Sequence, residues 1–558
     1  MREPETKRSM YLRRWSALKN ERSSWFTHWR EISDSVMPRQ GRFFVSDRNV
    51  GKKRHNNIYD GTASKSLDRL AAGLMAGMTS PARPWFRLAV SDYKLMESEG
   101  VKMWLDDTSR LMREIFSRSN TYRALHSMYK ELGGFGTGAV IVVSDFDTII
   151  HMHPLTIGEY AVATDYKGNV NTLYREFDMT VAQVVAEFGK DKVSKGVKES
   201  WERGNLDQWV TIIHCIEPRA DRDLTKKDAQ NMPFKSIYLE AGGEDDEEVL
   251  RESGYKHFPV LAPRWDVSGG DIYGNSPGMS ALGDIRQLQH QQLRKAEAID
   301  YQVKPPVQVP IAMRGQDHDL LPGGVSYVDT ANPTGGIRSA YEVTLNLQHL
   351  LIDIQDVRTR IKETFYEDLF MMIANDNRSG ITAREIAERH EEKLIMLGPV
   401  LERLHNEMLA PLIDITFEKM VETGVMPMPP KELQGMDIKV EFVSMLAQAQ
   451  RAVGTGAVDR LLGTVGMIAQ MKPEVLDKID ADQIVDKYSD MLGVDPDLIL
   501  ADDKVAIIRE NRAKQQQAMQ QMAAAESMAA TANTLGNTPN GEEGGNMLSD
   551  ITRQFTQL

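Results

Sequence analysis

One glycine-rich stretch carries the pattern of a phosphate-binding loop. Residues 133–138, Gly-Gly-Phe-Gly-Thr-Gly, contain the closely spaced glycines that let backbone amides approach phosphate. Such a loop follows a strand and opens a helix, whereas here a helical pattern precedes the glycines and a strand pattern begins at Ala139. The stretch also lacks the Lys-Ser or Lys-Thr pair of an ATPase. The sequence therefore argues against nucleotide binding here.

Two acidic pairs are the next candidates, for a magnesium site. Asp145 with Asp147 and Asp495 with Asp497 could hold Mg²⁺ in a nuclease, because hard cations prefer carboxylate oxygens. Neither pair has a supporting acidic cluster beside it in the sequence. Solvated turns are the favoured interpretation of both pairs.

Histidine and cysteine residues point to no metal centre either. His151, His153 and His214 lack a Cys or carboxylate at the spacing that zinc sites use, so we interpret them as core or surface residues. Cys215, the single cysteine, lies in an apolar run typical of a buried strand and is interpreted as an inert core thiol. We predict no catalytic residues, no metal and no cofactor.

Composition limits the class of protein further. The chain has 558 residues, a net charge of -13 and 41% hydrophobic residues, enough for a sizeable core. This acidity argues against a protein that grips nucleic acid by neutralising phosphates, although a smooth passage for DNA remains compatible with it. No apolar run reaches the ~18 residues of a membrane span, and the charged N-terminus lacks a signal-type apolar region. We expect the protein to be made and folded in the cytosol.

Two long helices joined by a Pro/Gly-rich excursion dominate the middle of the chain. Ser276 followed by Pro277 is the pattern of an N-cap, and Lys304-Pro305-Pro306 ends the first helix. Each helix of about 25 residues would be roughly 38 Å long, so the pair is predicted to form a stalk with a small tip. The residues predicted to pack the stalk share one apolar stripe on each helix: Leu282, Ile285, Leu288, Leu293, Ile354, Val357, Ile361 and Phe365.

The regions before and after the stalk differ in their predicted secondary structure. Helices are predicted at 5–37, after a cap at Asp60, and near 100–118 and 122–132. Strands with turns follow from 139 to 265, interrupted by a helix with Val181, Val184, Val185 and Phe188. After the second long helix, residues 371–380 are predicted to be a polar loop. Thr382-Ala-Arg-Glu385 is then a capping box that opens a further helix, with a bend at Gly398-Pro399.

The C-terminal part is predicted to be helical and then low in complexity. A strand at 437–442 precedes helical pieces over 444–500, and a helix runs from Lys504 to about Ala530. Its Gln/Ala-rich composition fits either a bundle of several copies or a single helix with frayed ends. Residues 533–546, rich in Gly, Asn, Pro and Glu, are predicted to be disordered.

Several motifs resemble the portal, or head-to-tail connecting, proteins of short-tailed bacteriophages. The most specific is Tyr-Gly-Asn-Ser-Pro-Gly-Met at 273–279, followed by a Gln-rich helix. The resemblance covers most of the first 500 residues, with the matching pieces in family order. The other matching pieces are residues 57–63, 70–88, 153–159, 264–265 and 381–385.

The resemblance implies an α+β, mainly α, portal fold with wing, long-helix stem, clip, tunnel loop and helical crown, assembled as a ring. On this chain the parts would run in order along the sequence. They are the wing or body at 1–270, the first stem helix at 271–304, the clip at 305–345, the second stem helix at 346–370, the tunnel loop at 371–381, a long wing helix and return strand at 382–443, the crown at 444–502, a barrel-like C-terminal helix at 503–532 and a flexible tail at 533–558.

The resemblance also implies function and partners. A ring of twelve copies would occupy one vertex of the capsid, assembled in the host bacterial cytoplasm, and would form a channel for double-stranded DNA packaging and ejection. Expected partners are the terminase large subunit, tail adaptor and tail tube proteins, the major capsid and scaffolding proteins, and internal core proteins at the crown, with no membrane. The candidate DNA-facing residues of the tunnel loop are Asn375, Asn377, Arg378 and Ser379, and the candidate docking residues of the clip are Gln316, Asp317, His318, Asp319 and Tyr327.

Two other function classes remain as alternatives. A packaging ATPase or nuclease lacks support, because the chain has no Gly-x-x-x-x-Gly-Lys-Ser/Thr motif. Another ring component, such as a tail adaptor, is disfavoured by the chain's size and by the order of long helix, tip and long helix.

Overall fold

The structure is a computed structural model that divides into two units, Met1–Gly466 and Met467–Leu558. It describes residues 6–43, 58–90, 95, 98–226, 228–242, 249–304, 306–308, 311, 338–339, 347–374, 397–433, 438–444, 446, 463–469, 472, 480, 482–485 and 502–537. The described part is mixed α/β and mainly helical, which agrees with the predicted class. Its helices include none long and apolar enough to cross a membrane.

Helices fill the first part of the first unit, close to where the sequence predicts them. Thr6 caps the first helix by accepting a hydrogen bond from the Ser9 amide, and Gly136 ends the fourth in the left-handed conformation, with φ of 78°. The N-cap residue of α2 is Gly61, one residue after the predicted cap at Asp60, although the Asp60 carboxylate does accept from the Thr62 amide at 2.9 Å. The helices are α1 (Lys7–Ser35), α2 (Thr62–Met78), α4 (Glu99–Arg118) and α5 (Thr121–Phe135).

Strands follow, mostly where predicted, and form two antiparallel sheets. One sheet has the order β3-β2-β9 and the other the order β4-β5-β6-β7-β8. The pattern of residues 139–265 missed β8 and the helix α7 (Lys195–Glu202), whereas α6 (Val181–Phe188) was predicted. The strands are β2 (Ala139–Asp145), β3 (Ile149–Leu155), β4 (Tyr160–Thr164), β5 (Val170–Thr180), β6 (Trp209–Pro218), β7 (Phe234–Glu240), β8 (Arg251–Tyr255) and β9 (Val260–Leu261), with a short 3₁₀ turn at Ala229–Asn231.

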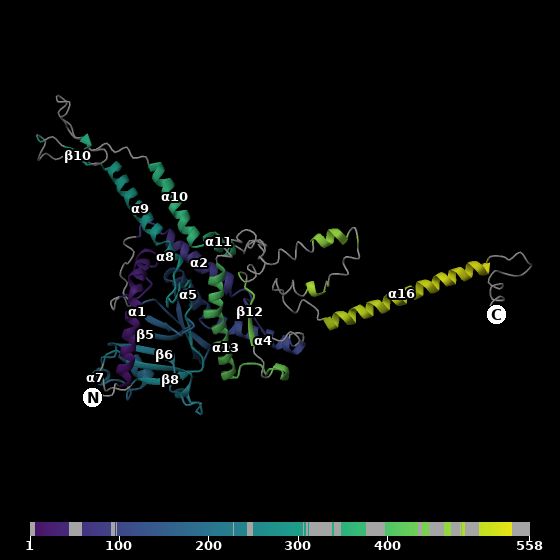
Figure 1. Cartoon of the computed structure of the whole chain (residues 1–558), viewed down its shortest axis with the longest axis horizontal. Helices are drawn as coiled ribbons and strands as arrows, with labels where there is room; N and C mark the ends of the chain where they lie inside the picture. The colour runs from purple at the N-terminus through teal and green to yellow at the C-terminus, as the bar shows by residue number, and fades with distance from the viewer. Residues whose placement is uncertain are drawn as a thin grey trace, which may run out of the picture. The chain divides into compact units, whose positions relative to one another are not determined.

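The five-stranded sheet is covered on both faces. Successive residues of β6 point to opposite sides and so take part in the packing on each face. Ile213 and Cys215 pack with Trp15 and other residues of α1, while Ile212 packs with α6 and α7 residues such as Val184. The largest core cluster joins residues of α2, α4 and α5 to residues of β2 and β3, and it includes Tyr160 and Leu173 of the five-stranded sheet. Figure 1 shows α1 running along one side of the sheet.

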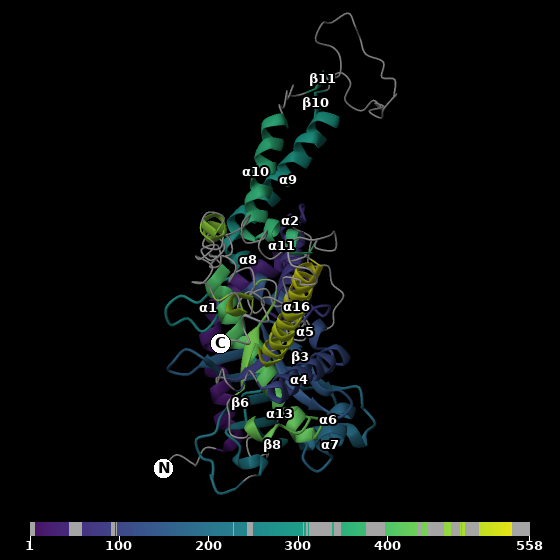
Figure 2. The same ribbon diagram turned by 90° about the vertical axis from the view of Figure 1, so that its right-hand side faces the viewer.

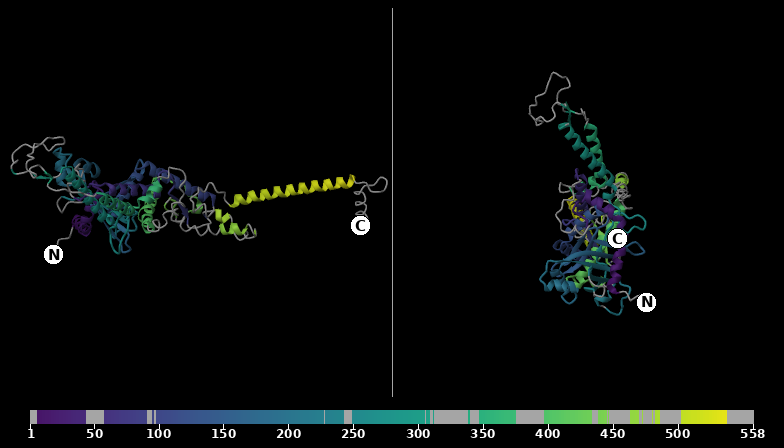
Figure 3. Two further views of the ribbon diagram at one scale, coloured as in Figure 1. Left: turned by 90° about the horizontal axis from the view of Figure 1, so that it is seen from above. Right: turned by 90° about the vertical axis from the view of Figure 1, so that its left-hand side faces the viewer.

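Two long antiparallel helices leave the body of the first unit as a hairpin. Ser276 caps α8 (Pro277–Ser280) by accepting from the Met279 amide, and Pro277 takes the first helical position, as predicted. The helices α9 (Leu282–Val303) and α10 (Leu347–Thr364) run side by side in all views (Figures 1, 2 and 3). Toward the end of the hairpin, β10 (Val307–Gln308) pairs with β11 (Arg338–Ser339).

The sequence predicted a return helix that is continuous to Phe370, but in the structure this helix is interrupted. It breaks at Tyr366, whose φ is 53°, and α11 (Glu367–Ala374) begins directly afterwards. Residues 371–374 are therefore helical, so the predicted polar loop at 371–380 begins too early. Both errors arise because side-chain contacts around the break, not local propensity, determine where the chain turns.

The helix that follows residue 397 contains a π-helical turn. Residues 397–404 are α-helical, His405–Leu409 form one π turn, and α13 (Ala410–Thr423) continues the helix. The irregularity thus lies several residues after the Gly398-Pro399 bend that the sequence predicted. After a 3₁₀ turn at Lys431–Leu433, the predicted return strand is β12 (Ile438–Phe442), which pairs with β1 (Phe86–Val90).

The second unit contains one long helix in its described residues. This helix, α16 (Asp502–Asn537), extends beyond the predicted end near Ala530 and includes the first residues of the predicted tail. Its described side chains are almost all exposed, and Arg509 pairs with Asp482 of the same unit at 2.6 Å. The predicted crown at 444–502 and the tail beyond residue 537 lie largely or wholly outside the described residues.

Candidate functional site

The hairpin joins the body at a junction that we call the root, formed by Asp60, residues 134–137, residues 274–278, Gln289, Gln292, Arg358 and Glu367. These residues come from four separate parts of the chain. They lie where the hairpin leaves the body, beyond which the upper parts of α9 and α10 project away from it (Figure 2).

Glycines bring two backbones of the root into direct contact. A Cβ on Gly136 would lie 2.1 Å from the Gly274 carbonyl oxygen, and a Cβ on Gly274 would lie 2.3 Å from the Gly136 carbonyl oxygen. The Gly274 amide donates to the Thr137 hydroxyl at 2.9 Å, and the Ser276 hydroxyl donates to the Gly134 carbonyl at 2.7 Å. The glycines at 133–138 are thus a packing surface for the start of α8, which agrees with the sequence argument against a phosphate loop.

Asp60 connects the start of α2 to both helices of the hairpin. Its Oδ2 accepts from Arg358 Nη2 at 2.7 Å and from Gln292 Nε2 at 2.9 Å. The Gln289 side chain accepts from the Asp60 amide and donates to the Asp60 carbonyl, both at 2.8 Å. Burial raises the pKa of Asp60, but hydrogen bonds from Thr62 and Arg358 outweigh it, so the pKa is lowered. The carboxylate therefore stays ionised at the root.

Glu367 holds the start of α11 against α2. The buried carboxylate accepts from the Ser66 hydroxyl at 2.7 Å and pairs with Arg69. Nearby, a Cβ on Gly73 would lie 2.3 Å from Cβ of Phe370, so α2 and α11 cross at a glycine. These contacts hold the start of α11, directly after the break at Tyr366.

Polar pairs also link the two helices of the hairpin directly. Gln291 of α9 donates to Asp353 of α10, and Arg360 of α10 pairs with Asp284 of α9 at 3.3 Å. Because these residues are largely exposed, each pair contributes little to stability. These pairs show which side of each helix faces the other helix.

The predicted packing residues of the hairpin are mostly buried in the structure. Seven of them are buried and Leu293 is half-buried, so its stripe loses cover farther along α9. Whether these residues also pack against other copies of the chain remains a prediction. The buried seven are Leu282, Ile285, Leu288, Ile354, Val357, Ile361 and Phe365.

The other predicted site residues lie outside the described residues. This holds for the tunnel-loop candidates and for the clip candidates. They are Asn375, Asn377, Arg378 and Ser379, and Gln316, Asp317, His318, Asp319 and Tyr327.

A buried ion pair supports the body below the root. The Arg264 guanidinium pairs with Glu407 at 2.6 Å and also donates to the Gly168 carbonyl at 2.8 Å. Glu407 lies in the π turn, and its Oε2 accepts from the Arg264 amide at 2.9 Å. The widened turn thus presents a carboxylate to both the backbone and the side chain of Arg264.

Glu131 is a fully buried carboxyl in α5. Its oxygens accept from the Thr156 hydroxyl at 2.8 Å and the Ile157 amide at 3.1 Å. Burial raises its pKa to about 7, and neighbouring Glu159 adds to the increase. From the sequence, the only sign that Glu131 is unusual is that a charged residue falls on the buried side of a predicted helix.

The histidines do not gather into a metal site. His214 is buried, lies 2.9 Å from the Ser236 hydroxyl and stacks on Tyr238, whereas His151 and His153 contact each other on β3. Burial, with Arg175 and His151 nearby, lowers the pKa of His153 to about 4. Within the part of the chain that the structure describes, no group of three or more His, Cys, Asp or Glu residues could hold a metal ion.

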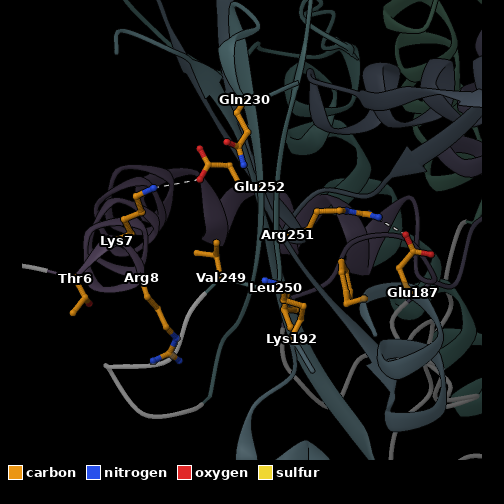
Figure 4. A pocket seen from close by; sticks show the side chains of 11 residues that line it. Thr6, Lys7, Arg8, Glu187, Lys192, Gln230, Val249, Leu250, Arg251 and Glu252 are labelled. Carbon is orange, nitrogen blue, oxygen red and sulfur yellow. Dashed lines mark hydrogen bonds and ion pairs between the residues drawn. The ribbon is translucent and has the colours of Figure 1, made fainter. Parts of the chain in front are cut away.

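A cavity of about 730 Å³ lies beside the start of α1 (Figure 4). Four of its charged lining residues form two ion pairs, Lys7 with Glu252 at 3.4 Å and Arg251 with Glu187 at 2.9 Å. The lining contains no nucleophile held by a base. It offers no organised catalytic arrangement.

Comparison with known proteins identifies relatives over nearly the whole chain. The profile of the family described as bacteriophage head to tail connecting protein matches residues 8–500. The "Probable portal protein" of Bordetella phage BPP-1 is 60% identical over 552 residues, covering 99% of both chains. The "Portal protein" of Salmonella phage epsilon15 is 46% identical over 535 residues, covering 96% of both.

Similarity to solved structures is much weaker. A chain of the "Virion of native gene transfer agent (GTA) particle" is 10% identical, with a TM-score of 0.35, and the match covers 78% of this chain and 91% of that one. A likeness at this level supports no conclusion about the fold.

Proposed function

The chain belongs to the family of bacteriophage head-to-tail connecting proteins, and from this premise we propose that it works as the portal protein of a short-tailed phage. It is a structural component of the virion rather than an enzyme. The observation that carries the proposal is its full-length similarity to two proteins named as portals. The hairpin and its firmly bonded root are the structural features that suit this role.

The working form that we propose is a closed ring of twelve copies at one capsid vertex. In such a ring, each copy uses one surface toward the preceding copy and a different surface toward the next, and the ring closes only if the rotation closes. A helical hairpin is suited to this geometry because it offers separate faces on a rigid element. At 22 residues, α9 is about 33 Å long, long enough to form a wall around an axis.

We propose that the molecule passing through the channel is double-stranded DNA. The net charge of -13 is compatible with a passage that repels phosphate, through which a duplex slides without binding tightly. The tunnel-loop residues Asn375, Asn377, Arg378 and Ser379 are the proposed DNA neighbours. Arg378 supplies the positive charge in that segment.

The tip of the hairpin is the proposed docking site for other proteins. The terminase would bind there during packaging and the tail adaptor afterwards, through residues that include Gln316 and Tyr327. The wing would contact major capsid and scaffolding proteins. Deleting residues 316–326 is then expected to leave rings intact and to abolish packaging or tail attachment in a complementation assay. Loss of the ring itself would contradict this assignment of the tip.

The ring proposal is tested by native mass spectrometry of the purified full-length protein. The expected species has a mass near twelve times that of the 62.9 kDa chain. A chain that stays monomeric at high concentration would refute the ring.

A further inference from the structure

An exposed run of prolines follows α13, and we call residues 426–430, Met-Pro-Met-Pro-Pro, the proline segment. Each of its residues is either a proline or stands directly before one, so its backbone is confined to the extended, polyproline II region. The peptide bonds before the three prolines are trans, and residues 427–430 belong to no helix or strand. The sequence alone therefore restricts this segment to one backbone conformation.

Contacts with the body hold the proline segment in place. Gly424, in the left-handed conformation with φ of 69°, ends α13 just before it. The Trp104 indole of α4 donates to the Pro427 carbonyl at 3.1 Å. After the segment, the Leu433 amide donates to the Pro430 carbonyl at 3.0 Å. Because the segment is already ordered on the body, a partner that binds it loses less conformational entropy.

Met428 projects from the proline segment into solvent. It is 95% exposed, whereas Met426 is partly buried and packs on the largest core cluster. Polyproline II has three residues per turn, so these two side chains point about 120° apart. Three more exposed apolar residues belong to the elements that hold the segment: Met103 at 60%, Val421 at 54% and Val425 at 44%. Exposed apolar side chains gathered in this way mark an interaction site.

The chemistry of the proline segment excludes the common alternatives for peptide recognition. A strand added to a sheet edge and a helix both need backbone N–H donors, which three of the five residues lack. The segment also carries no charge and no chain terminus. The remaining mode is a groove lined by aromatic side chains, which receives prolines in the polyproline II conformation. The body itself contacts the segment with an aromatic side chain, Trp104.

We infer that the proline segment is a docking site for a second protein, one that offers an apolar groove lined by aromatic side chains. Met428 enters this groove, where its flexible thioether side chain packs against the aromatic wall. A second copy of this chain does not supply the groove at its cavity beside α1, because Phe188 is the single aromatic residue that lines it. The inference rests on the proposed function only in that the partner is sought in phage particles.

Photo-cross-linking from position 428 tests the inference in assembled particles. A full-length chain with p-benzoylphenylalanine in place of Met428 is supplied by complementation, and the purified particles are irradiated. The expected result is one covalent adduct with a protein other than this chain, mapped by mass spectrometry to a peptide that contains aromatic residues. The same photoreactive residue in place of Leu224, a 77% exposed position on the body, is the control and is expected to give no such adduct.

Substitutions test whether Met428 and the prolines carry the binding. Met428→Asp puts a charge into the apolar groove and is expected to lower the yield of infectious particles by about tenfold or more. Its thermal midpoint is expected to match that of the wild type, since the side chain is exposed, and Leu224→Asp is the matched control. Combining Pro427→Gly with Pro429→Gly frees the backbone and is expected to weaken the adduct from position 428.

The outcomes separate this inference from the proposed function. No adduct in particles that contain the chain, or an adduct between two copies of the chain, would overturn the docking site and leave the portal function standing. An undiminished adduct in the glycine variant would overturn the polyproline II mode of binding, and a wild-type particle yield for Met428→Asp would overturn the role of Met428. A wild-type chain that is absent from purified particles would overturn both the inference and the proposed function.

Discussion

At the scale of single residues, one buried carboxylate joins the hairpin to the body. Asp60 has a side chain only 6% exposed, and it bonds to residues of α2, α9 and α10 together. A buried charge of this kind is costly unless its oxygens are all satisfied. Its partners satisfy it, so Asp60 fixes the direction in which the hairpin leaves the body.

Asp60→Asn is expected to lower the unfolding free energy at neutral pH by about 1.5–3 kcal/mol, the range for hydrogen bonds to charged groups. The native pKa lies below its ordinary value of 3.8, so this stability is present above about pH 4 and is lost as the pH falls through the native pKa. Denaturant unfolding at pH 7 measures the loss. Asp107→Asn, at an exposed carboxylate paired with Arg110, is the control and should change stability by less than about 0.5 kcal/mol.

Glu131 makes the opposite contribution to the pH dependence of stability. The native carboxyl holds its proton up to a pKa of about 7, whereas the unfolded one loses it near 4.5. Native protein therefore binds more protons between these values, and stability falls as the pH rises through that window. The cost is fully present above pH 7 and is on the order of 3 kcal/mol, at about 1.4 kcal/mol per pKa unit.

Glu131→Gln is expected to remove this pH dependence. Its amide can accept from the Ile157 amide and donate to the Thr156 hydroxyl, so the geometry survives without the charge. Thermal unfolding at about pH 5 and about pH 8 measures the effect, and the variant should gain most over wild type at the higher pH. Equal differences at both pH values would show that Glu131 does not titrate in this window.

Sequence patterns predicted Asp60 only as a local helix cap. Its partner Arg358 lies 298 residues away, and nothing in the periodicity of either segment couples the two. Glu131 and Glu407 were missed for the same reason, because a buried charge is identified by its tertiary neighbours. The tunnel-loop and clip candidates came from resemblance alone and stay predictions.

At the scale of elements, the root depends on two segments of the chain whose backbones come into contact at glycines. Gly136 needs its left-handed φ of 78°, which glycine adopts without steric cost, and Gly274 leaves no room for a side chain beside it. This packing gives a physical reason for the motif at 273–279, since its glycine lets α8 start directly against the end of α5.

Gly274→Ala is expected to destabilise the protein by about 1–3 kcal/mol or more, since the new methyl group must displace the Gly136 backbone. Gly283→Ala is the matched control, because its Cβ would have nothing within 4 Å in α9. The control should be neutral or stabilising by up to about 1 kcal/mol, the helix preference of alanine over glycine. Thermal unfolding of both variants measures the difference, and equal midpoints would contradict close packing at the root.

The elements show where local patterns succeed and where they fail. Capping at Ser276 and the breaking pair Pro305-Pro306 are local, and the predicted end of the first long helix agrees with the structure, although the helix predicted to run from Pro277 is divided at Ala281 into α8 and α9. The break at Tyr366 and the π turn that carries Glu407 depend on contacts with α2 and Arg264. Sequence therefore predicted the hairpin but not the turn that ends it.

At the scale of the whole molecule, the first unit combines a well-packed body with a hairpin that exposes apolar residues on its upper part. Sequence motifs were sufficient to predict the portal family, which the full-length relatives confirm. They did not predict that β1 pairs with β12, some 350 residues later, because strand pairing at that separation has no local signal. Exposed Tyr301, Val303 and Ile352 are compatible with the ring that we propose.

The most direct test of that conclusion is cryo-electron microscopy of the purified full-length protein. We predict end-on rings with a central hole wide enough for a DNA duplex, and a map in which α9 and α10 of successive copies pack side by side around it. A monodisperse monomer at high concentration, or a ring in which the hairpins do not touch one another, would contradict the conclusion.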